Sequence, residues 1–191
     1  MARSRLIVGV TGSSAPQLGL LMLQVLHERD DMEVHLVISK GARKSIGAEL
    51  DLGPEAFEKL ADVVHEPDDM GASISSGSFR TIGMTIIPCS MHTLGEVASG
   101  TGSSLVSRAA DVCLKERRPL VLVTRETPLN LIHLRNMETV TLAGATVLPP
   151  VPAFYHRPVT IDDLLMQTVG KVLDQFHLEH RLFRRWGGDD G

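Results

Sequence analysis

The sequence is poor in cysteine, and this scarcity excludes two classes of small protein. Only Cys89 and Cys113 occur among the 191 residues, and they do not form a CxxC pair. Two isolated cysteines supply neither a disulfide framework nor a cysteine-rich zinc site. Both lie within apolar patterns, which predicts buried free thiols in a reducing compartment. We therefore expect a cytoplasmic protein without a cysteine-rich zinc site.

Long hydrophobic runs and an excess of positive charge are also absent. The apolar run at residues 6–10 is too short for a signal-peptide core, and no stretch approaches the length of a membrane span. The 19 Lys and Arg residues are outnumbered by 23 Asp and Glu residues, which gives a formal net charge of -4. This balance argues against nucleic-acid binding, and we expect no membrane association.

What the chain does contain is a regular alternation of apolar strands and amphipathic helices. Strands are predicted at residues 5–10, 33–38, 84–88, 119–123 and 145–148, and helices after Pro16, at 41–50, 54–65 and 128–143, and after Thr160. Right-handed crossovers would place these strands in a parallel sheet covered on both faces. We predict a Rossmann-like, flavodoxin-like α/β fold with three α/β/α layers. One domain spans residues 1–191, with a C-terminal tail from about residue 181.

Three predicted strands end in turns that are rich in hydroxyl or charged residues. Gly12-Ser13-Ser14 follows the first strand, Ser90 follows the third and can cap the next helix, and Thr124–Thr127 follows the strand at 119–123. Ligands bind at the carboxyl edge of open α/β sheets, where helix N-termini offer N–H groups to anions. The sequence therefore predicts an anion-binding pocket at this edge. The Gly- and Ser-rich stretch 67–80 is a candidate active-site loop.

Charged residues also gather on the predicted helix that precedes residue 119. Arg108 and Lys115 lie two helical turns apart and share one face. With Arg125 at the neighbouring strand end, they suggest a pocket for an anionic ligand. An ordinary surface ion-pair ladder through Asp111 explains the same spacing, and spacing alone does not separate the two interpretations.

Six segments together resemble one known family, the flavin prenyltransferases of the UbiX type. They are VTGSSAPQLG (10–19), SGSF (76–79), IIPCSMHTL (86–94), RAADVCLKERRPLVLVTRETPL (108–129), HLRNM (133–137) and PPVPAFYHRP (149–158). The resemblance covers nearly the whole chain. It implies an enzyme that joins the dimethylallyl group of dimethylallyl phosphate to N5 and C6 of reduced FMN. The product, prenylated FMN, would go to a UbiD-type decarboxylase. The resemblance further implies a homo-oligomer, commonly a dodecamer, with sites between subunits and no metal.

Position by position, the resemblance assigns three sets of site residues. The FMN-binding set is Gly12, Ser13, Ser14, Ser39, Ser90, Met91, His92, Thr93 and Arg125. The set that binds dimethylallyl phosphate is Arg108, Lys115, Tyr155 and Lys171. The catalytic set is Glu49, Glu126 and Ser90. Cations and hydroxyl donors suit a departing phosphate, and Glu126 could serve as its acid. Phe79 or the flavin could face an allyl cation.

Several positions depart from the family pattern and keep two alternatives open. Ala15 stands where a glycine is usual in the first turn, and Pro16 follows it and donates no N–H. His92 replaces a common Lys, and Lys171 replaces Arg. One alternative is a non-catalytic FMN carrier. The other is an FMN-dependent decarboxylase of a peptide cysteine or of phosphopantothenoylcysteine. The absence of a complete PxMNxxMW-like motif counts against the second.

Overall fold

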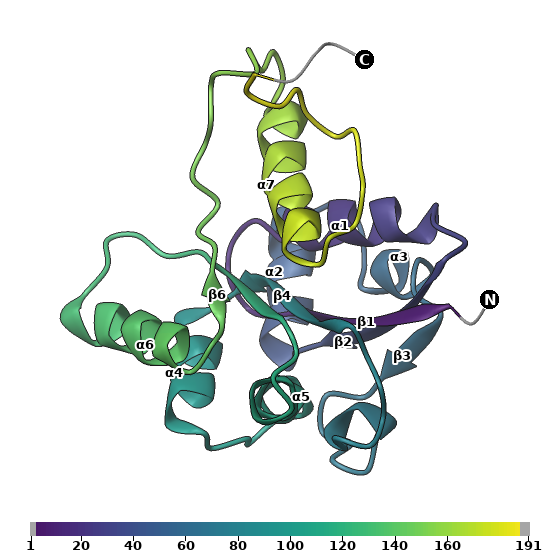
Figure 1. Ribbon diagram of the computed structural model, residues 1–191, viewed down its shortest axis with the longest axis vertical. Coiled ribbons are helices and arrows are strands. Elements are labelled where there is room, and N and C mark those ends of the chain that lie inside the picture. The colour runs from purple at the N-terminus through teal and green to yellow at the C-terminus, as the bar shows by residue number, and fades with distance from the viewer. Residues whose placement is uncertain (1–2, 188–191) are drawn as a thin grey trace.

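The computed structural model describes residues 3–187 and contains a six-stranded parallel sheet (Figure 1). The strands are β1 (Ser4–Val10), β2 (Met32–Ile38), β3 (Val63–His65), β4 (Gly83–Cys89), β5 (Leu120–Thr124) and β6 (Thr146–Val147). Their order across the sheet is β3-β2-β1-β4-β5-β6, and every neighbouring pair is parallel. The strand order reverses between β1 and β4. This switch point is where open α/β sheets form a ligand crevice.

Helices cover both faces of this sheet and complete the predicted three layers. They are α1 (Gln17–His27), α2 (Lys40–Glu49), α3 (Glu55–Glu58), α4 (Met91–Ser99), α5 (Leu105–Lys115), α6 (Leu131–Leu142) and α7 (Ile161–Gln175), with a short 3-10 helix, η1 (Ser73–Ser75). The helices α1, α2, α3 and α7 contribute to one apolar core, whereas α4, α5, α6 and η1 contribute to the other. Among the described residues, no helix is long and apolar enough to cross a membrane.

Alternation along β1 shows how the strands separate these two cores. Leu6, Val8 and Val10 belong to the core beneath α1, and Ile7 belongs to the core beneath α5. Leu6 of β1 and Leu18 of α1 are both fully buried in the core between the sheet and α1. Removing each such side chain from water contributes roughly 1.5–3 kcal/mol. The buried strands are therefore apolar on both faces, as a covered parallel sheet requires.

Both cysteines are free and buried, as the sequence predicted. Burial raises the pKa of Cys89 and the pKa of Cys113 to about 12. Both groups therefore stay protonated at neutral pH and pack as small apolar side chains.

Three local predictions were wrong. The predicted helix at 54–65 ends after α3, because the β-branched pair Val63 and Val64 extends the sheet as the edge strand β3. The helix predicted at 128–143 begins only at Leu131, because the side chain of Asn130 caps it by accepting from the His133 amide. The apolar periodicity after Thr160 predicts that Ile161 faces the core, but Ile161 is the first residue of α7 and is exposed. The predicted tail is described only to residue 187, and its acidic end lies outside the described residues.

Candidate active site

A pocket of about 290 Å³ lies at the switch point of the sheet. Its walls come from the turns that follow β1, β2 and β4, from the loop after β3 and from the start of α5. Five of the predicted FMN-binding residues line it: Gly12, Ser39, Ser90, His92 and Thr93. The sequence reasoning therefore located this edge correctly, although it arrived there from separate motifs.

Three helices present their N-termini to this pocket, and each is capped by a serine. Ser39 accepts from the Ala42 amide at 3.1 Å, and Ser90 accepts from the Thr93 amide at 3.2 Å. Ser104 accepts from the Ser107 amide at the start of α5. N-terminal N–H groups and the positive ends of helix dipoles favour an anion. Hydroxyls and free amides converging on one cavity fit the phosphate and the polar edge of FMN.

The side chain of Thr11 and the glycine at position 12 bring these turns close together. The hydroxyl of Thr11 donates to the carbonyl of Pro88 at 2.9 Å and accepts from the amide of Ser90 at 2.8 Å. It thereby ties the end of β1 to the end of β4. A Cβ atom on Gly12 would lie 2.9 Å from the carbonyl carbon of Gly41, closer than real Cβ contacts. Glycine at position 12 therefore lets the first turn approach the start of α2.

A second group of predicted residues meets beside the pocket. Ser13 donates from its hydroxyl to the carbonyl of Arg125 at 2.7 Å. The Glu49 carboxylate accepts from the Ser14 hydroxyl at 2.9 Å and from the Ala15 amide at 3.0 Å. Glu49 thus supplies an anion at the start of α1, where Pro16 offers no side-chain cap. Residues from three separate segments are joined here.

The departure at Ala15 is accommodated by the backbone. Ala15 adopts a φ of 69°, in the left-handed region where glycine is favoured. A residue with a Cβ pays roughly 1–2 kcal/mol for this conformation. The turn keeps its shape nonetheless, and the amide of Ala15 remains a donor to Glu49.

Other predicted residues of this edge have ordinary surface partners. The exposed Glu126 accepts from the Thr127 amide at 3.0 Å. The ring of His92 lies 3.4 Å from the carboxylate of Glu96. Met91, the first residue of α4, is partly buried against the core beneath α5.

The predicted donor-binding residues on α5 lie at its two ends. Arg108 donates to the carbonyl of Ser75 at 3.2 Å and pairs with Asp111 at 2.9 Å, so half of the ion-pair ladder is present. Lys115 pairs with Glu116 instead, at 2.5 Å. Seven helical residues separate the two cations by about 10 Å along the axis. Lys115 thus lies toward the amino edge of the sheet, in a second pocket of about 470 Å³ beside the C-terminal end of α6.

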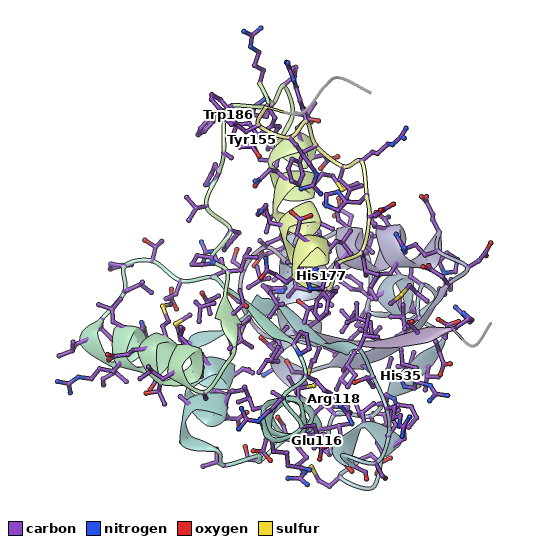
Figure 2. The ribbon with its side chains drawn as sticks, viewed as in Figure 1. His35, Glu116, Arg118, Tyr155, His177 and Trp186 are labelled. Carbon is purple, nitrogen blue, oxygen red and sulfur yellow. The ribbon has the colours of Figure 1, made fainter. Side chains whose placement is uncertain are left out.

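Tyr155, another predicted donor-binding residue, lies far from Lys115. Figure 2 shows Tyr155 and Trp186 at one end of the molecule and Glu116, the neighbour of Lys115, at the opposite end. The rings of Tyr155 and Trp186 meet edge to face with centroids 5.8 Å apart. Lys171, on α7, pairs with Asp174 at 3.2 Å. One chain therefore does not bring the predicted donor-binding residues together.

Comparison with known proteins decides between the families that share this fold. A family model described as Flavoprotein matches residues 1–177. The flavin prenyltransferase UbiX of Escherichia coli strain K12 is 53% identical over 186 residues, covering 96% of this chain and 98% of that protein. The chain belongs to the UbiX flavin prenyltransferase family. A probable UbiX-like flavin prenyltransferase of Streptomyces sp. strain D7 is 50% identical, with 96% and 92% covered.

Solved structures of UbiX family members share this fold closely. The crystal structure of AnUbiX (PadA1) in complex with FMN and dimethylallyl pyrophosphate has a TM-score of 0.94 and 52% identity, covering 97% of this chain and 98% of that chain. A dodecameric FMN-dependent UbiX-like decarboxylase from Escherichia coli O157:H7 has the same TM-score and 51% identity, covering 96% and 100%. The cysteine decarboxylase TvaF is only 15% identical at a TM-score of 0.63, which shows a shared fold alone.

Sequence reasoning missed several residues that shape the pocket. Thr11, Ser104 and Glu96 were not singled out, and neither was the ion pair of Lys40 with Asp68 at the pocket wall. A capping signal for Ser104 was present, since a hydroxyl residue preceded an apolar helical pattern. The roles of Thr11, Glu96 and the Lys40–Asp68 pair depend on which turns face each other in the folded chain, which the sequence does not show. Within residues 3–187, no group of three or more His, Cys, Asp or Glu side chains is arranged to hold a metal ion.

Proposed function

We propose that this protein joins the dimethylallyl group of dimethylallyl phosphate to N5 and C6 of reduced FMN, and that a UbiD-type decarboxylase receives the product. The observation that carries this proposal is the convergence of three serine-capped helix N-termini on one pocket at the switch point. The proposal is also supported by a relative, since the chain is 52% identical to AnUbiX (PadA1), whose crystal structure contains FMN and dimethylallyl pyrophosphate.

The FMN side of the reaction belongs to the carboxyl edge of the sheet. We assign FMN binding to Gly12, Ser13, Ser14, Ser39, Ser90, Met91, His92, Thr93 and Arg125. When bound, reduced FMN supplies the two ring positions that accept the dimethylallyl group. Those positions must lose protons, and the hydroxyl of Ser14 already donates to the Glu49 carboxylate at 2.9 Å. We assign to Glu49 the role of proton acceptor, reached through Ser14, and to Ser90 the orientation of the flavin edge.

The donor side needs cations around a departing phosphate. Arg108, Lys115, Tyr155 and Lys171 supply three positive charges and a hydroxyl donor, which would stabilise negative charge as the carbon–oxygen bond breaks. Glu126, when protonated, would give a proton to the leaving phosphate. Because Lys115 and Tyr155 lie at opposite ends of one chain, we infer that different copies contribute them to one site. A dodecameric relative of 51% identity supports such an assembly.

We place this reaction in the cytoplasm. Both cysteines are free thiols, which fits a reducing compartment. A reducing compartment also suits an enzyme whose flavin must be reduced.

Anaerobic incubation tests the function. The purified protein is mixed with reduced FMN and dimethylallyl phosphate, and the flavin is analysed by mass spectrometry. A flavin heavier by one isoprenoid C5 unit supports the prenyltransferase. Flavin that is bound but unmodified would favour the carrier, and loss of carbon dioxide from a cysteine-containing peptide would favour the decarboxylase. The ability of Ala15 to adopt positive φ removes one argument for the carrier.

A further inference from the structure

The C-terminal return segment, residues 178–187, runs back along α7 (Figure 1). It lies so close to the helix that only a glycine fits at position 170. A Cβ atom there would meet the ring of Phe183 at 2.5 Å and the ring of His180 at 2.6 Å. The carbonyl of Glu179 also accepts from Arg29 at 2.8 Å, which fastens the segment to the end of α1. The segment is therefore a packed part of the fold.

Asp174, near the end of α7, is the ionic centre of this packing. Its carboxylate accepts from Arg185 at 2.6 Å and 3.1 Å, from His180 at 3.1 Å and from Lys171 at 3.2 Å. The ring of His180 is 3% exposed, and its Nδ1 accepts from the Leu182 amide at 3.3 Å. Its proton is therefore on Nε2, where it points at Asp174. Three side chains thus fill the acceptor positions of one carboxylate.

The carboxylate of Asp174 is connected to two predicted donor-binding residues, Lys171 on α7 and Tyr155 in the loop before it. Lys171 contacts Asp174 directly. Tyr155 is reached through the return segment, because Trp186 follows Arg185 in the chain and packs edge to face on Tyr155 (Figure 2). Asp174 therefore contacts Lys171 directly and is linked to Tyr155 through Arg185 and Trp186.

We propose that Asp174 is a positioning residue for the prenyl donor, which rests on the proposed function. In the free protein it holds the Lys171 ammonium in place. When a phosphate arrives, Lys171 turns to it, while Asp174 stays neutralised by the bidentate Arg185 and the His180 N–H. Because Asp174 keeps two partners, moving the Lys171 ammonium from Asp174 to the phosphate costs little free energy. Arg185 meanwhile keeps Trp186 against Tyr155.

Replacing Asp174 with Asn tests this role, because the amide keeps the shape and loses the charge. Titration of dimethylallyl phosphate into the complex with oxidised FMN measures donor affinity without turnover. We expect donor affinity to fall about tenfold, which corresponds to about 1.4 kcal/mol, while FMN affinity stays unchanged. Trp186 is the only tryptophan of the chain, so its fluorescence anisotropy reports the return segment and should fall.

Three further proteins keep the test decisive. Asp62→Asn removes a comparable ion pair, with Arg3 at the far edge of the sheet, and should leave donor affinity unchanged. Asp174→Glu should restore part of the affinity. If Asp174→Asn does not fold, Arg185→Gln releases the segment by itself and should weaken donor binding. Equal donor affinity in a folded Asp174→Asn or Arg185→Gln protein overturns the proposal. Failure of the unmodified protein to alkylate reduced FMN would instead reject the proposed function.

Discussion

The pocket at the switch point and the arm formed by residues 149–160 with α7 are built in opposite ways. The pocket is made of strand ends, serine caps and close backbone contacts such as that between Gly12 and Gly41. The arm is anchored by the apolar side of α7, through Val169, Val172 and Leu173, and by the ion pairs of Asp174, and it projects away from the sheet (Figure 1). The comparison suggests that one chain preforms the flavin half of the site, whereas the donor half needs assembly.

Exposed apolar side chains support this contrast. Val151, Phe154, Val159 and Ile161 on the arm are each between 69% and 91% exposed. Apolar side chains that gather on one exposed segment are typical of an interaction site. None of the residues that line the pocket is an exposed large apolar side chain. We expect the arm to contact a second copy of the chain.

The largest effect is expected for a change that disables only the donor half. Replacing Glu126 with Gln removes the proposed acid without changing the shape of the side chain. General acid catalysis contributes about 100-fold or more, so turnover should fall by that order. FMN should stay bound, as judged by the flavin absorbance of the purified protein. Unchanged turnover would remove Glu126 from the mechanism.

A change at Asp174 should alter the stability of the arm at acid pH. Its hydrogen bonds to Arg185, Lys171 and His180 outweigh its burial and hold the pKa of Asp174 at about 2, below the usual 3.8. A depressed carboxyl pKa stabilises the fold above about pH 4, and this stability is lost as the pH falls toward 2. The difference corresponds to about 2 kcal/mol. Urea unfolding of Asp174→Asn at pH 7 and pH 3 measures it. The variant should be weaker at pH 7, and an equal deficit at both pH values would contradict this origin.

A change in the first turn should affect the flavin half alone. Gly12→Ala places a Cβ atom 2.9 Å from the Gly41 backbone and must push the turn away from α2. We expect FMN affinity to fall about tenfold, or about 1.4 kcal/mol, by flavin fluorescence titration. Gly47→Ala is the matched control, because a Cβ there meets nothing within 4 Å. An equal FMN affinity of both variants would show that the close approach does not shape the pocket.

The smallest effect concerns a histidine pair outside both halves. The Nδ1 atom of His35 lies 2.9 Å from the Nε2 atom of His65, and burial together with this neighbour lowers the pKa of His65. His65 binds a proton less readily in the folded chain than in the unfolded chain. The free energy of unfolding therefore falls as the pH drops below about 6.5, where the histidine of the unfolded chain becomes protonated. Urea midpoints at pH 7 and pH 5.5 should therefore differ more for the unmodified protein than for His65→Gln. A larger pH dependence in His65→Gln would refute this assignment.

Local patterns in the sequence predicted the position of the pocket at the switch point, because its parts are short and independent. Strand, turn and N-cap signals located Ser90 and the Gly12 turn, the family resemblance added Ser39, and the parallel sheet brings all three to one edge. The helix predicted at 54–65 failed because Val63 and Val64 gain more from pairing with β2 than a helix offers, and pairing is not local. The contact of Ser14 with Glu49 likewise depends on how α2 packs beside the first turn.

The complete donor half could be assigned from the family resemblance only, because its predicted residues lie apart in a single chain. Arg108 and Lys115 belong to a regular helix, so their spacing was predictable. Their relation to Tyr155 is not a property of one chain, because Tyr155 lies at the other end of the molecule (Figure 2). Spacing along a sequence carries no information about contacts between copies.

Subunit mixing tests most directly whether the donor half is shared between copies. Lys115→Ala and Tyr155→Phe are each prepared as inactive proteins, and the two are then co-expressed so that they assemble together. If one site takes Lys115 and Tyr155 from different copies, random mixing leaves roughly a quarter of the sites intact. The mixed oligomer should then prenylate reduced FMN at about that fraction of the unmodified rate. No recovery of activity in a mixed oligomer of normal size would contradict the account.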